Sequence, residues 1–212
     1  MTVRRIFLAR HGNRQDRVHP GWAETAVERH DPPLSIDGFE QARALGRRLA
    51  SEDVTAIVAS PFLRTVQTAI AVNETLGVPL HLEPGFGEWL SVDSFERLPR
   101  LRPFAELKAL HPQLNDRQAC GQLTWPETRE QLQARVQAAL FRWIRQIEGT
   151  LLLISHASPI GAAVLLDGSL SRVECSLCAL FCLEHDAGRF RLVVSGDVAH
   201  VGARLATFVF PP

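Results

Sequence analysis

At 212 residues, the chain is long enough for an α/β fold with a buried core, and we expect a single domain over residues 1–212. Its 23 Lys and Arg residues balance 23 Asp and Glu residues, which excludes a net charge that would attract nucleic acid or an anionic membrane. No apolar stretch approaches the roughly 20 residues that span a bilayer, and the apolar run after Arg5 is too short for a signal peptide. We therefore expect a cytoplasmic protein.

The first predicted elements are a strand and a helix joined by a long polar loop. Residues 3–9 contain the apolar run Ile-Phe-Leu-Ala, which is typical of a buried strand in a parallel sheet. The polar segment 10–35 follows. Ser35 is then predicted to be the N-cap of a helix, because apolar residues recur behind it every three or four positions.

A second strand and helix come next in the chain. Residues 56–59 form another apolar run that predicts a buried strand. Ser60 and Pro61 predict the N-cap and the first residue of a helix, which we expect to end at Gly77. A short strand is predicted over 80–82.

The long segment 83–125 is irregular, with a short helix near 103–110. This segment and residues 13–35 are the two loop insertions that we expect to cover the functional site. Thr124 and Glu127 have the spacing of a capping box and predict the start of a long amphipathic helix.

The last part of the chain contains further strands around one helix. The predicted elements are a strand at 151–154, a helix from Pro159 to Leu166, and strands near 178–184, 189–195 and 205–210. The alternation of strands and helices predicts an α/β fold, a three-layer α/β/α sandwich with a mainly parallel central sheet.

Two histidines directly follow predicted strands. Arg10-His11-Gly12 follows the first strand, and Ser155-His156 follows the strand at 151–154. Ligands of open parallel sheets bind beyond the carboxyl ends of the strands, so both histidines are placed where chemistry is usual. Gly12 allows close approach of a ligand, and the neighbouring arginine favours an anion. Taken singly, His11 is compatible with a surface turn at a strand end, and the segment around His156 with an N-cap cluster of Ser155 and Ser158.

Arg64 and Glu88 extend this candidate site. Arg64 lies in the first turn of its predicted helix, where side chains lean toward the sheet edge and free N–H groups attract anions. Glu88, between Phe86 and Trp89, is expected to be partly desolvated, and such a carboxyl can act as a general acid. Alone, Arg64 would be assigned to a solvated helix face and Glu88 to a surface loop.

The combination of these residue types suits phosphoryl transfer. Arginine forks bind phosphate oxygens, one neutral imidazole can attack phosphorus to give a phosphohistidine, and the other can stabilise the equatorial oxygens. A carboxylic acid can protonate the leaving oxygen and later activate water. The scheme calls for no metal and no cofactor, because the cationic side chains offset the phosphate charge.

The four cysteines leave a second interpretation open. They are Cys120, Cys175, Cys178 and Cys182. The C-x-x-C spacing of the middle pair permits a metal or redox site. No second such pair completes a tetrahedral ligand set, and the run 178–182 is apolar, so we expect free thiols packed in the core.

Several motifs, in order along most of the chain, make it resemble the histidine phosphatase superfamily with its phosphoglycerate-mutase-like fold. They are Arg10-His11-Gly12, Asp31-Pro32-Pro33-Leu34-Ser35, Ser60-Pro61-x-x-Arg64-x-x-Gln67-Thr68-Ala69, Glu83-Pro84-Gly85 with Glu88-Trp89, and Ser155-His156. The likeness extends to the branch of Sts-type phosphatase domains. Asn13 departs from the residues usual in that branch.

The resemblance implies a role for each matching residue. His11 would be the phosphorylated nucleophile, and Glu88 would be the proton donor. Arg10, Arg64 and His156 would form the phosphate pocket. Arg14 would contact the phosphate or the rest of the substrate.

The implied activity is metal-independent hydrolysis of phosphomonoesters. A phosphoglycerate mutase-type isomerase using the same pocket is the alternative, although the stretch after Glu88 does not resemble the mutase segment. The expected partner is a phosphorylated small molecule or peptide; no nucleic acid and no membrane are expected, and the oligomeric state stays open. Candidate residues for the cavity entrance are Trp22, Trp89, Phe95, Arg97, Arg100 and Arg102.

Overall fold

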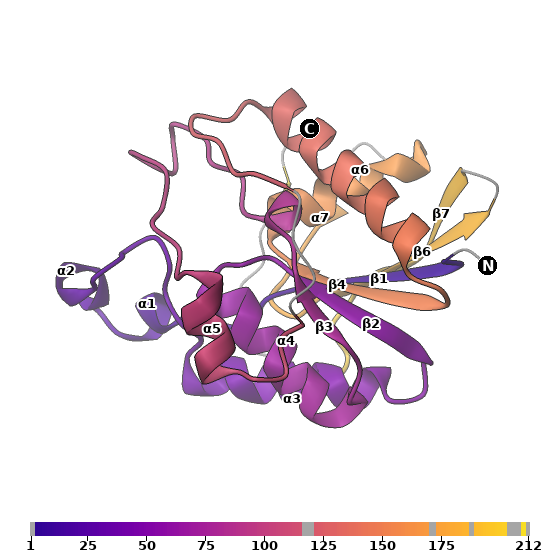
Figure 1. Ribbon diagram of the computed structural model, residues 1–212, viewed down its shortest axis with the longest axis horizontal. Coiled ribbons are helices and arrows are strands. Elements are labelled where there is room, and N and C mark those ends of the chain that lie inside the picture. Colours follow the sequence, from indigo (N-terminus) through magenta and orange to yellow (C-terminus); the bar gives the residue numbers. More distant parts are fainter. Residues whose placement is uncertain (1–2, 116–120, 170–172, 187–188, 203–208, 211–212) are drawn as a thin grey trace.

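A mixed β-sheet organises this chain, of which the computed structural model describes residues 3–115, 121–169, 173–186, 189–202 and 209–210. In spatial order the strands are β3 (Leu80–Leu82), β2 (Val54–Ala59), β4 (Thr150–Ser155), β1 (Arg5–Arg10), β6 (Leu180–Asp186) and β7 (Arg189–Asp197). The first four run parallel, whereas β6 is antiparallel to both β1 and β7 (Figure 1). The sheet is therefore mainly parallel, as predicted.

Helices cover both faces of the sheet. α3 (Ile36–Leu49) and α4 (Leu63–Leu76) lie on one face, and α6 (Arg129–Gln146) and α7 (Ala157–Val164) lie on the other (Figure 1). Alternate strand residues serve the two layers: Phe7 packs toward α3 and α4, and Ile6 packs toward α6 and α7. Strands buried on both faces need continuous apolar runs, which is why those runs predicted the three-layer sandwich correctly.

A second sheet in the described residues has two short strands. β5 (Val173–Glu174) pairs with β8 (Val209–Phe210), while the remainder of the strand predicted over 205–210 lies outside the described residues. None of the helices within the described ranges has both the length and the apolar composition needed to cross a bilayer.

Helix starts were predicted with mixed success. Ser35 caps α3 as expected, because its side chain accepts a hydrogen bond from the Gly38 amide. The capping box of α6 is formed by Thr128 and Gln131, so the assignment to Thr124 and Glu127 was wrong. The Glu127 side chain is instead turned inward, where it pairs with an arginine of α6.

The start of α4 also differs from the prediction. The helix begins at Leu63, and Phe62 rather than Ser60 is its N-cap residue. The N-terminus of α4 is capped from a distant loop, because the Asp31 carboxylate accepts a hydrogen bond from the Leu63 amide at 2.7 Å. The Ser60 hydroxyl is therefore available to a different partner in the site.

Helix α7 starts two residues before the predicted Pro159 and ends at Val164, followed by a short 3-10 turn at Leu165–Asp167. Proline is tolerated in the first turn of a helix because that N–H has no intrahelical acceptor. The helix can thus begin directly after His156, which is its N-cap residue.

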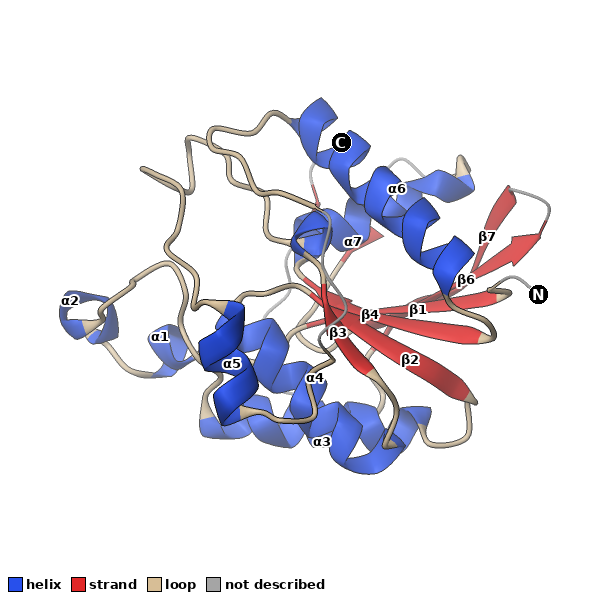
Figure 2. Ribbon diagram, in the orientation of Figure 1, coloured by secondary structure: helices blue, strands red, loops and turns tan. Residues whose placement is uncertain are grey.

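The two long loop segments contain short helices and approach the same end of the sheet. α1 (Gln15–Val18) and α2 (Trp22–Thr25) lie in the first, and α5 (Phe104–Leu110) lies in the second, as predicted near 103–110 (Figure 2). The second segment begins with a 3-10 turn at Pro84–Phe86.

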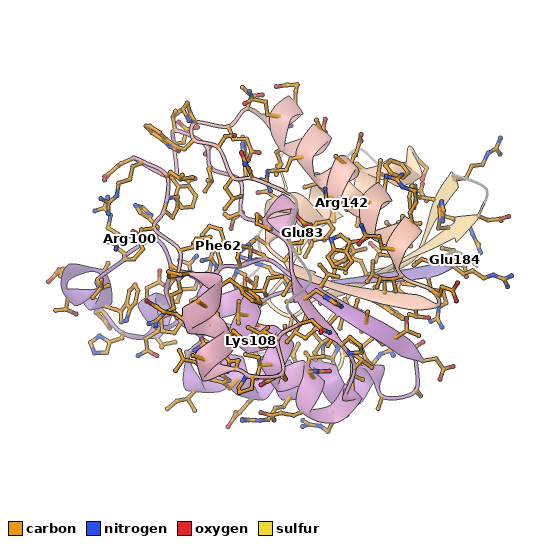
Figure 3. The ribbon with its side chains drawn as sticks, in the orientation of Figure 1. Phe62, Glu83, Arg100, Lys108, Arg142 and Glu184 are labelled. Atoms are coloured by element: carbon orange, nitrogen blue, oxygen red, sulfur yellow. The ribbon has the colours of Figure 1, made fainter. Side chains whose placement is uncertain are left out.

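Glu83 anchors the start of the second loop segment. Its buried carboxylate accepts a hydrogen bond at 2.6 Å from Nη2 of Arg142 on α6, and the two residues are labelled in Figure 3. It also accepts one from Trp143 Nε1 on the same helix at 3.0 Å. It also accepts from the amides of Gly85 and Gly121. A buried carboxylate with this number of donors is fully satisfied, so Glu83 fixes where the loop leaves the sheet.

Candidate active site

The candidate site forms where three parallel strands end side by side. β4 lies between β1 and β2, so the segments after all three strands leave the sheet at the same edge. Backbone hydrogen bonds continue past the strands, from the His11 amide to the Ser155 carbonyl at 3.1 Å and from the Ser60 amide to the Ile154 carbonyl at 3.0 Å. These bonds bring together chain segments that are far apart in sequence.

The His11 ring is oriented by its own backbone. Nδ1 lies 2.8 Å from the Gly12 carbonyl oxygen, and a carbonyl can only accept, so Nδ1 carries the hydrogen and Nε2 keeps a lone pair. The Gly12 amide donates to Thr68 Oγ1 at 3.1 Å. A side chain at Gly12 would overlap the backbone of Gly38, which explains why the motif has glycine at this position.

His156 lies beside His11, with 5.4 Å between their ring centroids. Its Nε2 is 2.8 Å from Ser60 Oγ, which also accepts from the Phe62 amide. Nδ1 lies 3.4 Å from Glu88 Oε2, so it faces the carboxylate that the sequence had singled out. The carboxylate oxygen near Nδ1 favours the tautomer with the hydrogen on Nδ1, and the Ser60 hydroxyl then donates to Nε2.

Two buried arginines complete the centre of the site. Arg10 donates from Nη1 to the Cys175 carbonyl at 2.7 Å. Arg64, with 1% of its surface exposed, has Nη2 3.6 Å from Glu88 and Nη1 3.9 Å from Asp31. Arg64 Nε and His156 Nδ1 are buried and form no hydrogen bond within the described residues. Buried donors of this kind are matched to an anionic ligand.

Burial and neighbouring cations determine the charge of these groups. Burial, Arg64 and Arg10 lower the pKa of His11 well below its usual value, and burial, Arg64 and His11 do the same for the pKa of His156. Burial lowers the pKa of Arg64 to about 10, so it remains a cation at neutral pH. The site therefore contains neutral imidazoles beside charged guanidinium groups.

We expect the two neutral histidines to make the protein less stable in mild acid. Below the ordinary imidazole pKa of about 6.5, the unfolded chain takes up protons that the folded site excludes. The free energy of unfolding should then fall between about pH 7 and pH 5, by up to about 1.4 kcal/mol per pH unit for each histidine. Urea denaturation across this range measures the slope. His11→Asn should make the slope shallower, and an unchanged slope would contradict the assignment.

A cavity of about 470 Å³ adjoins the buried imidazoles at Glu88, which lines it and lies 3.4 Å from His156 Nδ1. Its lining residues are Arg10, Arg14, Asp16, Arg17, Arg29, His30, Pro32, Arg64, Glu88, Trp89, Ser94, Phe95, Ala157 and Ser158. Five arginines thus face only two carboxylates. Ala157 and Ser158 add the N-terminal turn of α7, whose free N–H groups favour an anion.

The structure therefore brings together all six residues that the sequence had singled out. Arg10, Arg64 and Glu88 line the inner cavity, and Arg14 lies on its wall. His11 and His156 are buried directly behind these residues and do not themselves line the cavity. Arg14 is engaged by Asp16, which accepts from its Nε at 2.9 Å and its Nη2 at 2.6 Å.

The predicted entrance is only partly correct. Trp89 and Phe95 line the cavity, but Trp22, Arg97, Arg100 and Arg102 are not among its lining residues. Arg97 approaches Glu28 at 3.5 Å instead. Sequence reasoning missed Arg17, Arg29 and His30, which reach the cavity through the conformation of the first loop.

Three of the four cysteines lie in described parts of the chain, and they are buried behind the site rather than in it. Cys175, Cys178 and Cys182 are buried free thiols, and burial raises the pKa of Cys175 and Cys178 to about 12. Cys120 lies outside the described residues. The described part of the chain holds no cluster of three or more His, Cys, Asp or Glu side chains suited to a metal. The thiols therefore act as core side chains, and the Cys175 carbonyl orients Arg10.

Comparison with curated proteins finds several relatives. The chain is 28% identical over 211 residues to a probable phosphoglycerate mutase GpmB of Enterobacter sp., covering 93% of this chain and 95% of that protein. It is 29% identical to the human ubiquitin-associated and SH3 domain-containing protein A, over 77% of this chain but 29% of that protein. It is also 29% identical to the Saccharomyces cerevisiae transcription factor tau 55 kDa subunit, where it spans 39% of that protein's length.

Solved structures share the fold at lower identity. The ecdysone phosphate phosphatase of Bombix mori, in complex with tungstate, has a TM-score of 0.68 and 20% identity, covering 91% of this chain and 93% of that one. A phosphoglycerate mutase from Bacillus anthracis has a TM-score of 0.66 and 18% identity, covering 93% of this chain and 94% of that one. The architecture is thus phosphoglycerate-mutase-like.

A family-level match covers nearly the whole chain. It extends over residues 6–198 and includes His11, His156 and every residue that lines the cavity. On this evidence the chain belongs to the histidine phosphatase superfamily, branch 1.

Proposed function

We propose that this protein is a phosphatase that hydrolyses phosphomonoesters through a phosphohistidine on His11. The observation that carries the proposal is the neutral His11 imidazole, with Nε2 unprotonated, buried next to Arg10 and Arg64, which line the cavity. Its neighbours Arg10 and Arg64 supply the fixed positive charge that phosphoryl transfer requires.

The first step transfers the phosphoryl group to the enzyme. His11 Nε2 attacks phosphorus while the bond from phosphorus to the ester oxygen breaks. Glu88, as the carboxylic acid, gives its proton to that oxygen, and the alcohol leaves. The guanidinium groups of Arg10 and Arg64 and the Nδ1–H of His156 bind the phosphoryl oxygens, whose charge develops during the step.

The second step releases the phosphate. A water oxygen attacks phosphorus, and Glu88, now a carboxylate, accepts one proton of that water. The bond between phosphorus and Nε2 breaks, which returns His11 as a neutral imidazole and yields inorganic phosphate. The scheme uses only side chains that line or underlie the cavity.

A mutase is the second candidate function. Similarity to GpmB over almost the full length of both chains favours it. Its first step would be identical, but the phosphoryl group would return to a bound hydroxyl instead of reaching water. The segment Glu88-Trp89-Leu90 lacks likeness to the mutase motif, and Trp89 occupies part of the cavity wall, which together favour hydrolysis.

One assay separates these functions. The purified protein is given a panel of phosphomonoesters, with and without a chelator, and released phosphate is measured. We expect phosphate release that the chelator does not reduce. Interconversion of 2- and 3-phosphoglycerate without phosphate release would favour the mutase, and activity abolished by the chelator would contradict the metal-free scheme.

Arg17 indicates which phosphomonoesters fit best. It lines the cavity, and within the described part of the chain its guanidinium forms no ion pair or hydrogen bond, unlike the other cavity arginines. Burial, Arg14 and Arg10 lower the pKa of Arg17, so a second negative group on the ligand would be favourable there.

We expect Arg17→Gln to discriminate between two matched substrates. For 3-phosphoglycerate, which carries a carboxylate, kcat/KM should fall about tenfold, the usual worth of one charge-assisted hydrogen bond. For glycerol 3-phosphate, which has a neutral hydroxyl in its place, kcat/KM should change less than about twofold. Equal losses of kcat/KM on both substrates would show that Arg17 does not bind the carboxylate of the leaving group.

A further inference from the structure

Arg135, on α6, holds the loop that carries Glu88. Its Nη1 donates to the carbonyl oxygens of Pro84 at 3.2 Å, Gly85 at 3.0 Å and Gly87 at 3.1 Å. Its Nη2 donates to the Glu88 carbonyl at 3.2 Å. Four carbonyls from five consecutive residues thus converge on one guanidinium, so the path of this loop depends on Arg135.

Glu127 fixes the guanidinium from the opposite side. Arg135 Nε and Nη2 lie 2.6 and 2.8 Å from the two Glu127 carboxylate oxygens, a bidentate pair. Both side chains are largely buried, with 10% and 2% of their surfaces exposed. Glu127 also binds the far end of the same loop, because its carbonyl accepts from Trp89 Nε1 at 2.9 Å and its amide donates to Leu90.

The Arg135–Glu127 pair therefore holds residues 84–90 on both sides of the Glu88 side chain. The pair does not line the cavity. The Glu88 carboxylate, by contrast, projects toward His156 Nδ1 at 3.4 Å and Arg64 Nη2 at 3.6 Å. Since a displacement of about 1 Å can cost on the order of 100-fold in rate, a loop held this firmly matters for proton transfer.

We propose that Arg135, together with Glu127, is a positioning residue that fixes Glu88 for proton delivery to the leaving oxygen. The proposal rests on the phosphatase function proposed above and adds two residues that do not contact the substrate. It has a specific signature, because a proton donor matters most for a poor leaving group. An alkoxide needs a proton to leave, whereas 4-nitrophenolate leaves without one.

The test compares kcat/KM for an alkyl phosphate and for 4-nitrophenyl phosphate in Arg135→Lys, Arg135→Gln and Glu127→Gln. Lysine keeps the charge but cannot form the bidentate pair or reach four carbonyls. We expect kcat/KM on the alkyl phosphate to fall about 10- to 100-fold, and on 4-nitrophenyl phosphate about threefold or less. Circular dichroism confirms that each variant is folded.

Arg142→Gln is the matched control. Arg142 lies seven residues further along the same helix and also binds a loop glutamate, Glu83, which keeps three other hydrogen bonds when Arg142 is removed. This variant should leave the ratio between the two substrates unchanged. The positioning role is wrong if the Arg135 variants lower kcat/KM equally for both substrates. It is also wrong if Arg142→Gln changes the ratio of the two kcat/KM values as much as they do.

The Glu88→Gln variant, alone and combined with Arg135→Gln, separates this proposal from the proposed phosphatase mechanism. If Glu88→Gln shows no preference for the good leaving group, the proton-donor role fails and the proposed function must be revised. If Glu88→Gln shows the preference but the Arg135 variants do not, only the positioning role fails. With both roles correct, Glu88→Gln combined with Arg135→Gln should be no worse on the alkyl phosphate than Glu88→Gln alone.

Discussion

Replacing His11 with alanine is expected to abolish turnover of phosphomonoesters, with kcat lowered by roughly 10⁴-fold or more. The effect should be this large because the side chain that forms the covalent bond is removed, and His30, the imidazole that lines the cavity, accepts a hydrogen bond from Arg29 on its Nε2. His156 cannot substitute, since its Nε2 is occupied by the Ser60 hydroxyl at 2.8 Å. Steady-state phosphate release measures the loss.

A trapping experiment supports the kinetic result. Acid-labile, base-stable phosphorylation of the native protein should appear on His11 by mass spectrometry after rapid mixing with substrate, and it should be absent from His11→Ala. His19→Ala is the matched control, because His19 is an exposed histidine outside the cavity. Phosphate release by His11→Ala at the native rate would remove His11 from the mechanism.

Glu88→Gln is expected to lower kcat/KM for alkyl phosphates by about 10²- to 10⁴-fold, the usual range for a general acid. Glutamine keeps the shape of the side chain but can neither release nor accept the proton. The substitution also removes the negative charge 3.6 Å from Arg64, so binding of the phosphate should be maintained or improved. A fall in kcat with an unchanged or lower KM is therefore the expected pattern.

Glu96→Gln provides the comparison for this variant. Glu96 lies in the same long loop, but its side chain is 74% exposed and pairs with Arg29. Its replacement should change kcat/KM for alkyl phosphates less than about twofold. Glu88→Gln that behaves like Glu96→Gln would assign the proton transfer to another group.

The inner part of the candidate site could be located from sequence because strand ends are predictable. Apolar runs identified β1, β2 and β4, and the residues just after parallel strands meet at one sheet edge. His11, Arg64 and His156 each lie within five residues of such a strand end, so their meeting follows from the sheet. Their roles in the reaction stay predictions that the variants above test.

The wall of the cavity was harder to predict because it depends on loop conformation. Glu83 and Glu88 lie in one loop and carry the same functional group. Glu83 nevertheless binds the buried Trp143 of α6, whereas Glu88 faces the cavity. The flanking Phe86 and Trp89 singled out Glu88, but no local signal showed that Glu83 turns into the core. Asp31 and Arg135 were likewise missed as supports, since each binds backbone groups that approach only after the chain has folded.

Two of the predicted helix starts were wrong for a related reason. Ser60 was expected to cap one helix and Glu127 to complete a capping box with Thr124, but tertiary partners outweighed this local preference for Ser60 and Glu127. Ser60 lies next to His156, and Glu127 is held by Arg135. A residue that could satisfy its own helix was, in each case, used to support the site.

The position of β4 in the middle of the sheet has a consequence for biosynthesis. β1 and β2 are made early but do not touch each other, and the strand that joins them, Thr150–Ser155, is made much later. A nascent chain that stops before Thr150 has no common edge on which His11 and Arg64 can meet. For the proposed phosphatase, we therefore expect activity only after β4 has been made, so no N-terminal fragment that ends before Thr150 should release phosphate.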